Sequence, residues 1–155
     1  QGRIARLVGV ENLFNLTIAE RNPQDGTMSC IGQSLRLEVP LDSRITEGAG
    51  PEGDQDRVTV GIRASDIILA KEDLSGSSAR NRLQGEVIAV ESRPPGYAIT
   101  LKLSSDHDPE MLRCHITGTA LDEMGIKVGQ QLWAVFKASS CFLVDEEQPT
   151  ESSTD

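Results

Sequence analysis

Hydrophobic residues occur along this chain in short runs that are separated by clusters of Gly, Pro, Asn and Asp. Runs of this length, rich in Val, Ile, Leu and Thr and bounded by turn residues, are typical of β-strands. In the first half they predict strands at residues 15–20, 27–31, 35–39 and 58–70, the last interrupted at 63–65. In the second half they predict strands at residues 83–91, 97–103, 111–116, 131–136 and 141–144.

Two segments predict short helices. Residues 118–124 follow Thr117, a suitable N-cap, and precede Gly125, which suits the end of a helix. The acidic residues of this segment fall late, where they oppose the helix dipole, so we expect only one or two turns. Residues 4–13 are the second candidate.

One stretch of the chain occurs twice. VTVGIRASDIILA at residues 58–70 aligns with LWAVFKASSCFLV at residues 132–144, at a constant offset of 74 (137 − 63 = 74). Turn-rich segments at 22–26 and 93–96 follow the first strand of each half. Five short strands with a small helix between the third and fourth are the order of an OB-like barrel. We therefore predict an all-β fold of two tandem five-stranded OB-like barrels with one or two short helices.

This repeat divides the chain into parts. We expect a first OB-like subdomain at residues 1–75, a second at 76–144 and an acidic, disordered tail at 145–155. Residues 42–56, rich in Gly, Pro and acids, predict a long surface loop, and residues 71–77 a hinge. Because the chain opens on QGRIARLVG without Met, we expect a further domain before it.

Charge and cysteine usage exclude some classes of protein. The net charge is −9, and without the five acids of the tail it is still −4 (−9 + 5 = −4), which disfavours nucleic-acid binding. Cys30, Cys114 and Cys141 show no CxxC spacing, so we predict buried, reduced thiols of a cytosolic protein. The sequence has no run of 18 apolar residues that could cross a membrane.

A set of local motifs resembles a known family. It begins with Ser78-Ala79-Arg80-Asn81 and continues through His115-Ile116-Thr117 to Trp133-Ala134-Val135-Phe136-Lys137-Ala138-Ser139. In this order the motifs resemble the molybdate-binding Mop or TOBE domain. Residues 60–70 look like the segment that precedes it in ATP-binding subunits of ABC-type molybdate importers. Residues 4–13 are similar to the junction where the nucleotide-binding domain of those subunits ends.

The residues of the motifs suit a tetrahedral dianion. Such a ligand needs hydrogen-bond donors on several sides and positive charge on at least one. Two cations, two hydroxyls and the backbone N–H groups of two small residues supply these. In related domains the matching positions bind across a subunit boundary, so the resemblance implies a homodimer. The candidate oxyanion-binding residues are Ser78, Ala79, Arg80, Thr117, Lys137 and Ala138.

Two positions depart from the family pattern. Ala120 stands where binding members carry a second hydroxyl, and Ala138 stands where a serine often follows the lysine. Each lost hydroxyl donor is worth on the order of 1 kcal/mol. These departures motivate an alternative, a vestigial pocket in a purely structural module. In the first half, Arg63-Ala64-Ser65 repeats the lysine motif without matching partners, and we interpret it as a structural echo.

Other chemistry is poorly supported. The sequence contains no G-x-x-x-x-G-K-[ST] phosphate loop, so we predict no enzyme here and place ATP and Mg only in the missing domain. Asp106-His107-Asp108 has no third ligand at zinc spacing, and we predict no metal site and no cofactor apart from molybdate or tungstate as ligand. No nucleophile elbow surrounds any serine.

The resemblance implies a function. We expect a cytoplasmic regulatory and dimerisation region of an importer's ATP-binding subunit, peripheral on the inner face of the membrane and linked to permease subunits through the missing domain. It would bind the oxyanion at a subunit interface for feedback control. The alternative is a dimerisation module without ligand, and a remote one is an OB-type nucleic-acid binder. The sequence leaves open the choice among molybdate, tungstate and sulfate, and whether the first barrel binds anything.

Overall fold

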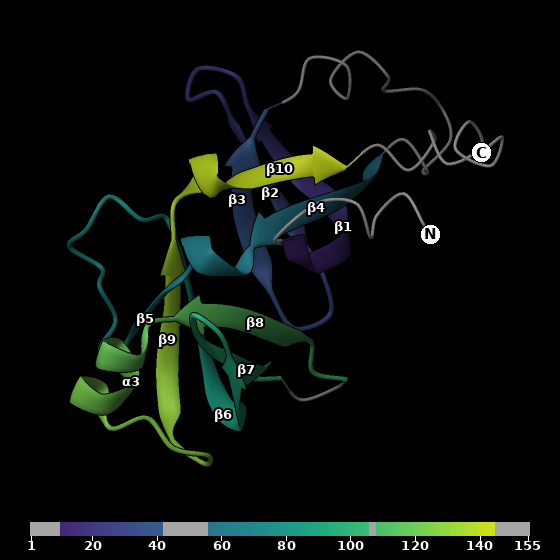
Figure 1. Ribbon diagram of the computed structural model, residues 1–155. Helices are drawn as coiled ribbons and strands as arrows, with labels where there is room; N and C mark the ends of the chain where they lie inside the picture. The colour runs from purple at the N-terminus through teal and green to yellow at the C-terminus, as the bar shows by residue number, and fades with distance from the viewer. Residues whose placement is uncertain (1–9, 42–55, 106–107, 145–155) are drawn as a thin grey trace, which may run out of the picture.

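The computed structural model describes residues 10–41, 56–105 and 108–144. They form two five-stranded sheets (Figure 1). The first sheet has the strand order β10-β4-β1-β2-β3. Its strands are antiparallel to their neighbours and comprise β1 (Val10–Asn22), β2 (Thr27–Ile31), β3 (Arg36–Pro40), β4 (Arg57–Arg63) and β10 (Cys141–Val144).

The second sheet has the order β5-β9-β6-β7-β8 and is also antiparallel. One α-helix, α3 (Gly118–Met124), connects β8 to β9, and the short 3₁₀ turns η2 (Ala64–Asp66) and η3 (Ala138–Ser140) interrupt the two repeated stretches. The strands of this sheet are β5 (Ile68–Ala70), β6 (Asn81–Arg93), β7 (Gly96–Leu103), β8 (Met111–Ile116) and β9 (Gln131–Phe136).

The predicted fold class is confirmed, with one correction near the start. The helix expected at residues 4–13 is wrong for residues 10–13, which belong to β1, while residues 4–9 lie outside the described part. The reason is that buried and less buried residues continue to alternate backward from Leu16 through Phe14 to Asn12, which is the period of a strand. The predicted loop and tail fall largely on residues 42–55 and 145–155, outside the described residues.

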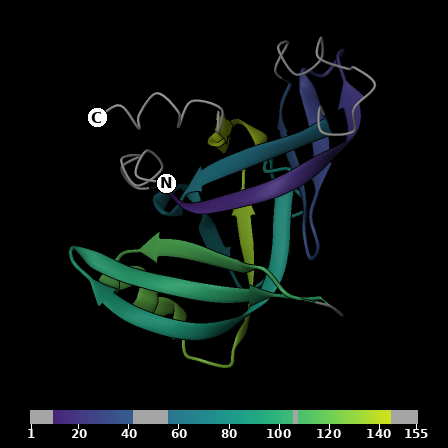
Figure 2. The same ribbon diagram turned by 90° about the vertical axis from the view of Figure 1, so that its right-hand side faces the viewer.

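The two sheets exchange their last strands. β5 follows β4 in the chain but pairs with β9, and β10 follows β9 but pairs with β4. Both views show β10 leaving the second sheet to lie along the first (Figures 1 and 2). Neither sheet is therefore complete without a strand from the other half of the chain. The division at residue 75 stays a prediction, and the exchange shows that the two halves fold as intertwined units.

The predicted helix and its caps are confirmed. The Thr117 hydroxyl accepts a hydrogen bond from the Ala120 N–H at 3.1 Å, and Gly125 adopts the left-handed conformation (φ 63°) that ends the helix. This helix has seven residues. Within residues 10–41, 56–105 and 108–144, no helix has the length and apolar character that a membrane crossing requires.

The core runs continuously from one sheet to the other. Leu16, Val60, Ile99 and Leu132 are among the buried side chains, drawn from both sheets. All three cysteines are buried and free, as predicted. Burial raises the pKa of Cys30 to about 11 and the pKa values of Cys114 and Cys141 to about 12. The thiols therefore stay protonated near neutral pH and pack as small hydrophobic groups.

These thiols predict a loss of stability at alkaline pH. Their folded-state pKa values lie above the ordinary thiol pKa of 9.0, so the folded state holds these protons more tightly than the unfolded chain. The resulting stability is present below pH 9 and is lost as the pH rises through the folded values. We expect the free energy of unfolding in urea to fall between pH 9 and pH 11. The variant Cys114→Ala should be less stable at pH 8 but show a smaller fall, and an equal fall would contradict this origin.

Candidate functional site

Five of the six predicted site residues lie at one end of the β6–β9 strand pair. Asn81, the first residue of β6, pairs with Phe136, the last residue of β9. Ser78-Ala79-Arg80 enter β6 at this end, and Lys137-Ala138 leave β9 at the same end. Ala79 is buried, whereas the side chains of Arg80 and Lys137 are exposed. The fold thus brings the two predicted cations together on neighbouring strand ends.

The sixth residue, Thr117, lies elsewhere in the same sheet. It follows Ile116, which pairs with Tyr97, and Tyr97 pairs with Ser92 of β6. Ser92 is 11 positions along β6 from Asn81 (92 − 81 = 11), a path of about 36 Å at roughly 3.3 Å per residue. Figure 1 shows α3, which begins after Thr117, low on the second sheet and η3 beside the first. A single chain therefore does not bring Thr117 to Arg80 and Lys137.

The two cations have no acidic partner among the described residues. The guanidinium of Arg80 donates a hydrogen bond to the carbonyl of Ser77, and none of the ion pairs in that part of the chain includes Arg80 or Lys137. The neighbouring Arg82 is paired, with its Nε 2.6 Å from Asp73. The chain has a net charge of −9, so two unneutralised cations at adjacent strand ends are a local excess of positive charge.

Asn81 fixes this end of the sheet against the first sheet. Its side chain is only 2% exposed. The amide oxygen accepts from the Glu38 N–H at 2.7 Å, and the amide nitrogen donates to the Glu38 carbonyl at 3.0 Å. The side chain thereby replaces a strand partner for β3. Since Asn81 directly follows Arg80, this contact also fixes where the predicted site begins.

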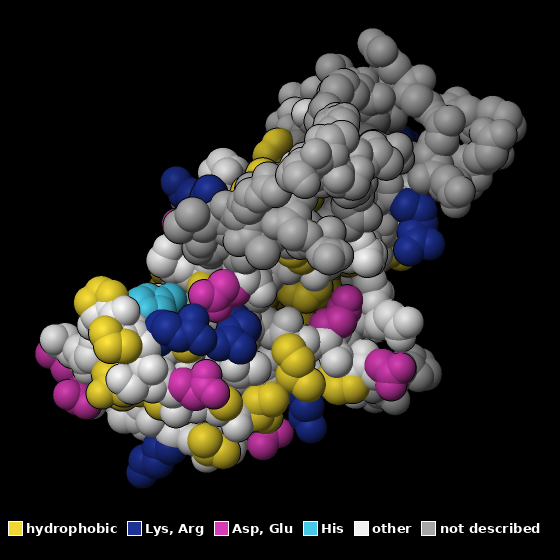
Figure 3. All heavy atoms as spheres, turned by 45° about the vertical axis from the view of Figure 1, so that its right-hand side comes forward, with side chains coloured by type: hydrophobic (Ala, Val, Ile, Leu, Met, Phe, Trp, Pro, Cys, Tyr) yellow, Lys and Arg dark blue, Asp and Glu magenta, His cyan; other side chains and the backbone are white. Residues whose placement is uncertain are grey.

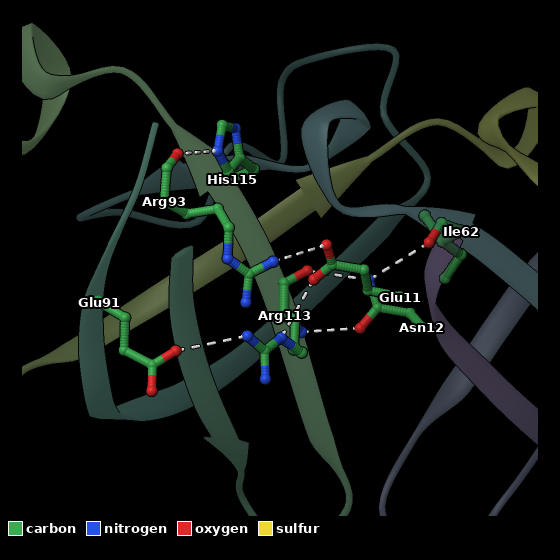
Figure 4. Close-up of polar contacts among 7 residues, drawn as sticks. All are labelled: Glu11, Asn12, Ile62, Glu91, Arg93, Arg113 and His115. Atoms are coloured by element: carbon green, nitrogen blue, oxygen red, sulfur yellow. Dashed lines mark hydrogen bonds and ion pairs between the residues drawn. The ribbon is translucent and has the colours of Figure 1, made fainter. Parts of the chain in front are cut away.

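Asn12 makes the equivalent contact from the first sheet to the second. It is likewise 2% exposed, accepts from the Arg113 N–H at 2.7 Å and donates to the Arg113 carbonyl at 2.9 Å (Figure 4). It also donates to the Ile62 carbonyl at 3.3 Å. Asn12 joins β1 to β8 as Asn81 joins β6 to β3, so the two halves are related by an approximate two-fold. Sequence reasoning missed both contacts, although polar residues at the start of two long strand runs were the signal for them.

This approximate symmetry identifies the first-half counterpart of Arg80. Asn12 pairs with Ile62, Asn81 pairs with Phe136, and Ile62 aligns with Phe136 in the repeat. Glu11 therefore stands where Arg80 stands. Its carboxylate oxygens lie 3.2 Å from Nε of Arg113 and 3.4 Å from a guanidinium nitrogen of Arg93 (Figure 4). A carboxylate at this position repels an anion, which gives a physical reason for interpreting Arg63-Ala64-Ser65 as a structural echo.

Figure 3 views the molecule toward the junction of the two sheets, where basic and acidic side chains are interleaved. Arg113 has two acidic partners, Glu11 and, at 3.5 Å, Glu91. His115 hydrogen-bonds through Nε2 to the Arg93 carbonyl at 3.1 Å (Figure 4). The arginines of this cluster are therefore neutralised by neighbours, in contrast to Arg80 and Lys137.

Comparison with known proteins identifies the second half. Residues 77–143 match the TOBE domain family. Over 146 residues the chain is 30% identical to the molybdate/tungstate import ATP-binding protein WtpC of Pyrococcus abyssi. The aligned region covers 90% of this chain and 39% of the relative. It is 32% identical over 137 residues to WtpC of Pyrococcus horikoshii, covering 88% of this chain and 33% of that protein. The chain thus spans only 33–39% of the length of these curated relatives.

A solved structure shares the architecture of both halves. The cytoplasmic molybdate-binding protein ModG, crystallised with molybdate bound, superimposes with a TM-score of 0.66 at 26% sequence identity. The match covers 88% of this chain and 97% of that one. The similarity therefore includes the pair of sheets and not the second sheet alone.

The asparagine contacts predict a large cost of truncation. Asn12→Ala would leave the N–H and carbonyl of Arg113 buried without their partners, which costs roughly 2–4 kcal/mol in the free energy of unfolding. Asn15→Ala is the matched control, because the side chain of this exposed asparagine on the same strand accepts a hydrogen bond from the Thr59 hydroxyl at 2.7 Å. We expect it to cost about 1 kcal/mol or less. Equal losses in urea unfolding would contradict a special role for Asn12.

Proposed function

We propose that this chain, which carries a TOBE domain and is homologous to molybdate/tungstate importer ATP-binding subunits, is a regulatory oxyanion-binding and dimerisation region of such a subunit. Its ligand is molybdate or tungstate. The ATPase activity belongs to a nucleotide-binding domain outside this chain, and the chain itself has a binding role and no catalytic one. The full protein lies at the cytoplasmic face of the membrane and meets the permease subunits through that domain.

One observation carries the proposal: Arg80 and Lys137 lie on adjacent strand ends without acidic partners in the described residues. The arginines near Glu11, by contrast, are neutralised by carboxylates. The guanidinium of Arg80 and the ammonium of Lys137, beside the backbone N–H groups of small residues, suit a tetrahedral dianion. The relation to ModG, whose structure holds molybdate, supports this choice of ligand.

The position of Thr117 supports a site shared between two chains. One chain holds Arg80 and Lys137 at one end of β6 and Thr117 beyond the other end. A second copy packed end to end supplies the missing hydroxyl, so the complete site is formed only in a homodimer. Ligand binding then stabilises that arrangement of subunits by its differential affinity for it, which is the physical basis of feedback control.

The second candidate function is a dimerisation module without ligand. The replacement of two hydroxyls by Ala120 and Ala138 favours it, because each lost donor weakens an anion site. It requires the same homodimer and differs only in its indifference to molybdate. The nucleic-acid alternative loses support from the neutralised arginines around Glu11, since a binding groove needs unpaired basic groups.

Isothermal titration calorimetry with molybdate tests the leading proposal. We expect saturable heat, and Arg80→Ala and Lys137→Ala should each weaken binding at least about tenfold, because each removes a charged donor. Arg63→Ala is the matched control, since Arg63 is the repeat counterpart of Lys137 and lies over the Phe142 ring at 5.3 Å. This variant should bind molybdate as the original chain does.

The outcomes separate the two candidates. Absence of heat at millimolar molybdate, together with a dimer in light scattering, would favour the ligand-free module. Equal weakening by Arg63→Ala and Lys137→Ala would contradict the assignment of the site to the second half.

A further inference from the structure

A groove of about 420 Å³ opens between the two sheets beside the Asn81 contact. Three arginines line it: Arg36 at the start of β3, and Arg80 and Arg82 on either side of Asn81. Trp133 of β9, the one tryptophan in the sequence, forms part of the wall. Lys137 and Thr117 are not among the lining residues, so this groove differs from the proposed oxyanion site although Arg80 borders both.

The groove is built before any ligand arrives. Asn81 holds the backbone of Glu38, two residues beyond Arg36, and thereby fixes the arginine-bearing end of β3. Ser34, in the connection before β3, donates from its N–H and its hydroxyl to the carboxylate of Glu110, at 2.8 and 2.7 Å. Both walls are therefore anchored by hydrogen bonds between the two sheets.

The charges in the groove favour an anion with more than one negative charge. Arg80 has no acidic partner in the described residues, and Arg36 lies 4.0 Å from Glu20 with both side chains mostly exposed, a weak pairing. Arg82 is paired with Asp73 and donates to the Ala79 carbonyl, so its guanidinium is held in one orientation. The fork of N–H donors on arginine matches the oxygens of a phosphate group.

The second wall favours a flat ring. Gln84 pairs directly with Trp133 across β6 and β9, and Arg82 lies two residues before Gln84 on the same face of the sheet. A half-buried indole next to an amide and a guanidinium can stack on an aromatic ring while hydrogen bonds fix its edge. The volume of about 420 Å³ also falls in the range of small-molecule sites and exceeds the needs of a four-oxygen anion.

We propose that this groove binds a mononucleotide-class ligand, a flat ring carrying a phosphate, at a site that shares Arg80 with the oxyanion site and otherwise differs from it. The phosphate lies between Arg36 and Arg80, and the ring lies along Trp133. A longer polyanion is disfavoured because the chain as a whole carries a net charge of −9. The proposal does not depend on molybdate binding, so either can fail without the other.

The fluorescence of Trp133 provides the test, because no other tryptophan contributes to the signal. Titration of the full 155-residue chain with AMP should change this fluorescence saturably at submillimolar to millimolar concentration, and calorimetry should give the same affinity. Adenosine and inorganic phosphate, each carrying half of the recognition chemistry, should bind at least about tenfold more weakly.

Variants assign the effect to the groove. Arg36→Ala should weaken AMP binding at least about tenfold and leave the heat of molybdate binding unchanged, whereas Lys137→Ala should do the reverse. Arg57→Ala, an exposed arginine on β4, is the matched control and should change neither. Because the Arg36 side chain is 59% exposed, its substitution should leave the fold intact, and circular dichroism checks this. Arg36→Glu is a second variant, which should abolish AMP binding.

Three results would overturn the proposal. The first is the absence of any fluorescence or calorimetric response to millimolar AMP. The second is equal affinity of the original chain and Arg36→Glu for AMP. The third is tighter binding of a single-stranded oligonucleotide than of AMP at physiological salt, which would indicate a nucleic-acid surface instead.

Discussion

Two buried asparagines hold the halves of this protein in one arrangement. Each side chain completes the hydrogen bonding of a strand that belongs to the other sheet, Asn12 at Arg113 and Asn81 at Glu38. A buried amide that uses its donor and its acceptor on the backbone C=O and N–H of one residue tolerates almost no change in position, because displacement leaves buried polar groups unpaired. The exchange of β5 and β10 gives the chain its connectivity, and the asparagines fix the register of the two sheets.

Function follows from this fixed register. The start of β6 carries Arg80, the end of β9 carries Lys137, and η3, which begins directly after Lys137, packs against β3 of the other sheet. The proposed anion-binding end of the second sheet therefore forms where the first sheet supports it. The contact between Asn81 and Glu38 places Arg36 across from Arg80, and the groove between the sheets forms there. In the first half the equivalent position holds Glu11, and its carboxylate turns the related end into a cluster of ion pairs.

Most of the fold was predictable from local patterns. The strands of the second half and the helix with its Thr117 cap agree closely with the predicted bounds, because alternation, turn residues and capping residues are local signals. The helix expected at residues 4–13 was wrong over residues 10–13, since a short run of mixed apolar residues does not distinguish a helical from a strand period. The exchange of strands was not predictable, because β5 and β10 have equivalent sequences and either sheet offers them an edge of the same kind.

The site was predictable in its members and not in their arrangement. Family resemblance selected Arg80, Lys137 and Thr117, but only the register of β6, β7 and β8 reveals that Thr117 lies at the far end from the cations. Arg36 escaped notice because nothing in the sequence connects it with Arg80, 44 positions further on (80 − 36 = 44). Their proximity depends on the contact between Asn81 and Glu38, an interaction over 43 residues. The role of Arg36 depends on a contact between residues far apart in the sequence. Such a contact leaves no local sequence pattern, so only the three-dimensional structure reveals it.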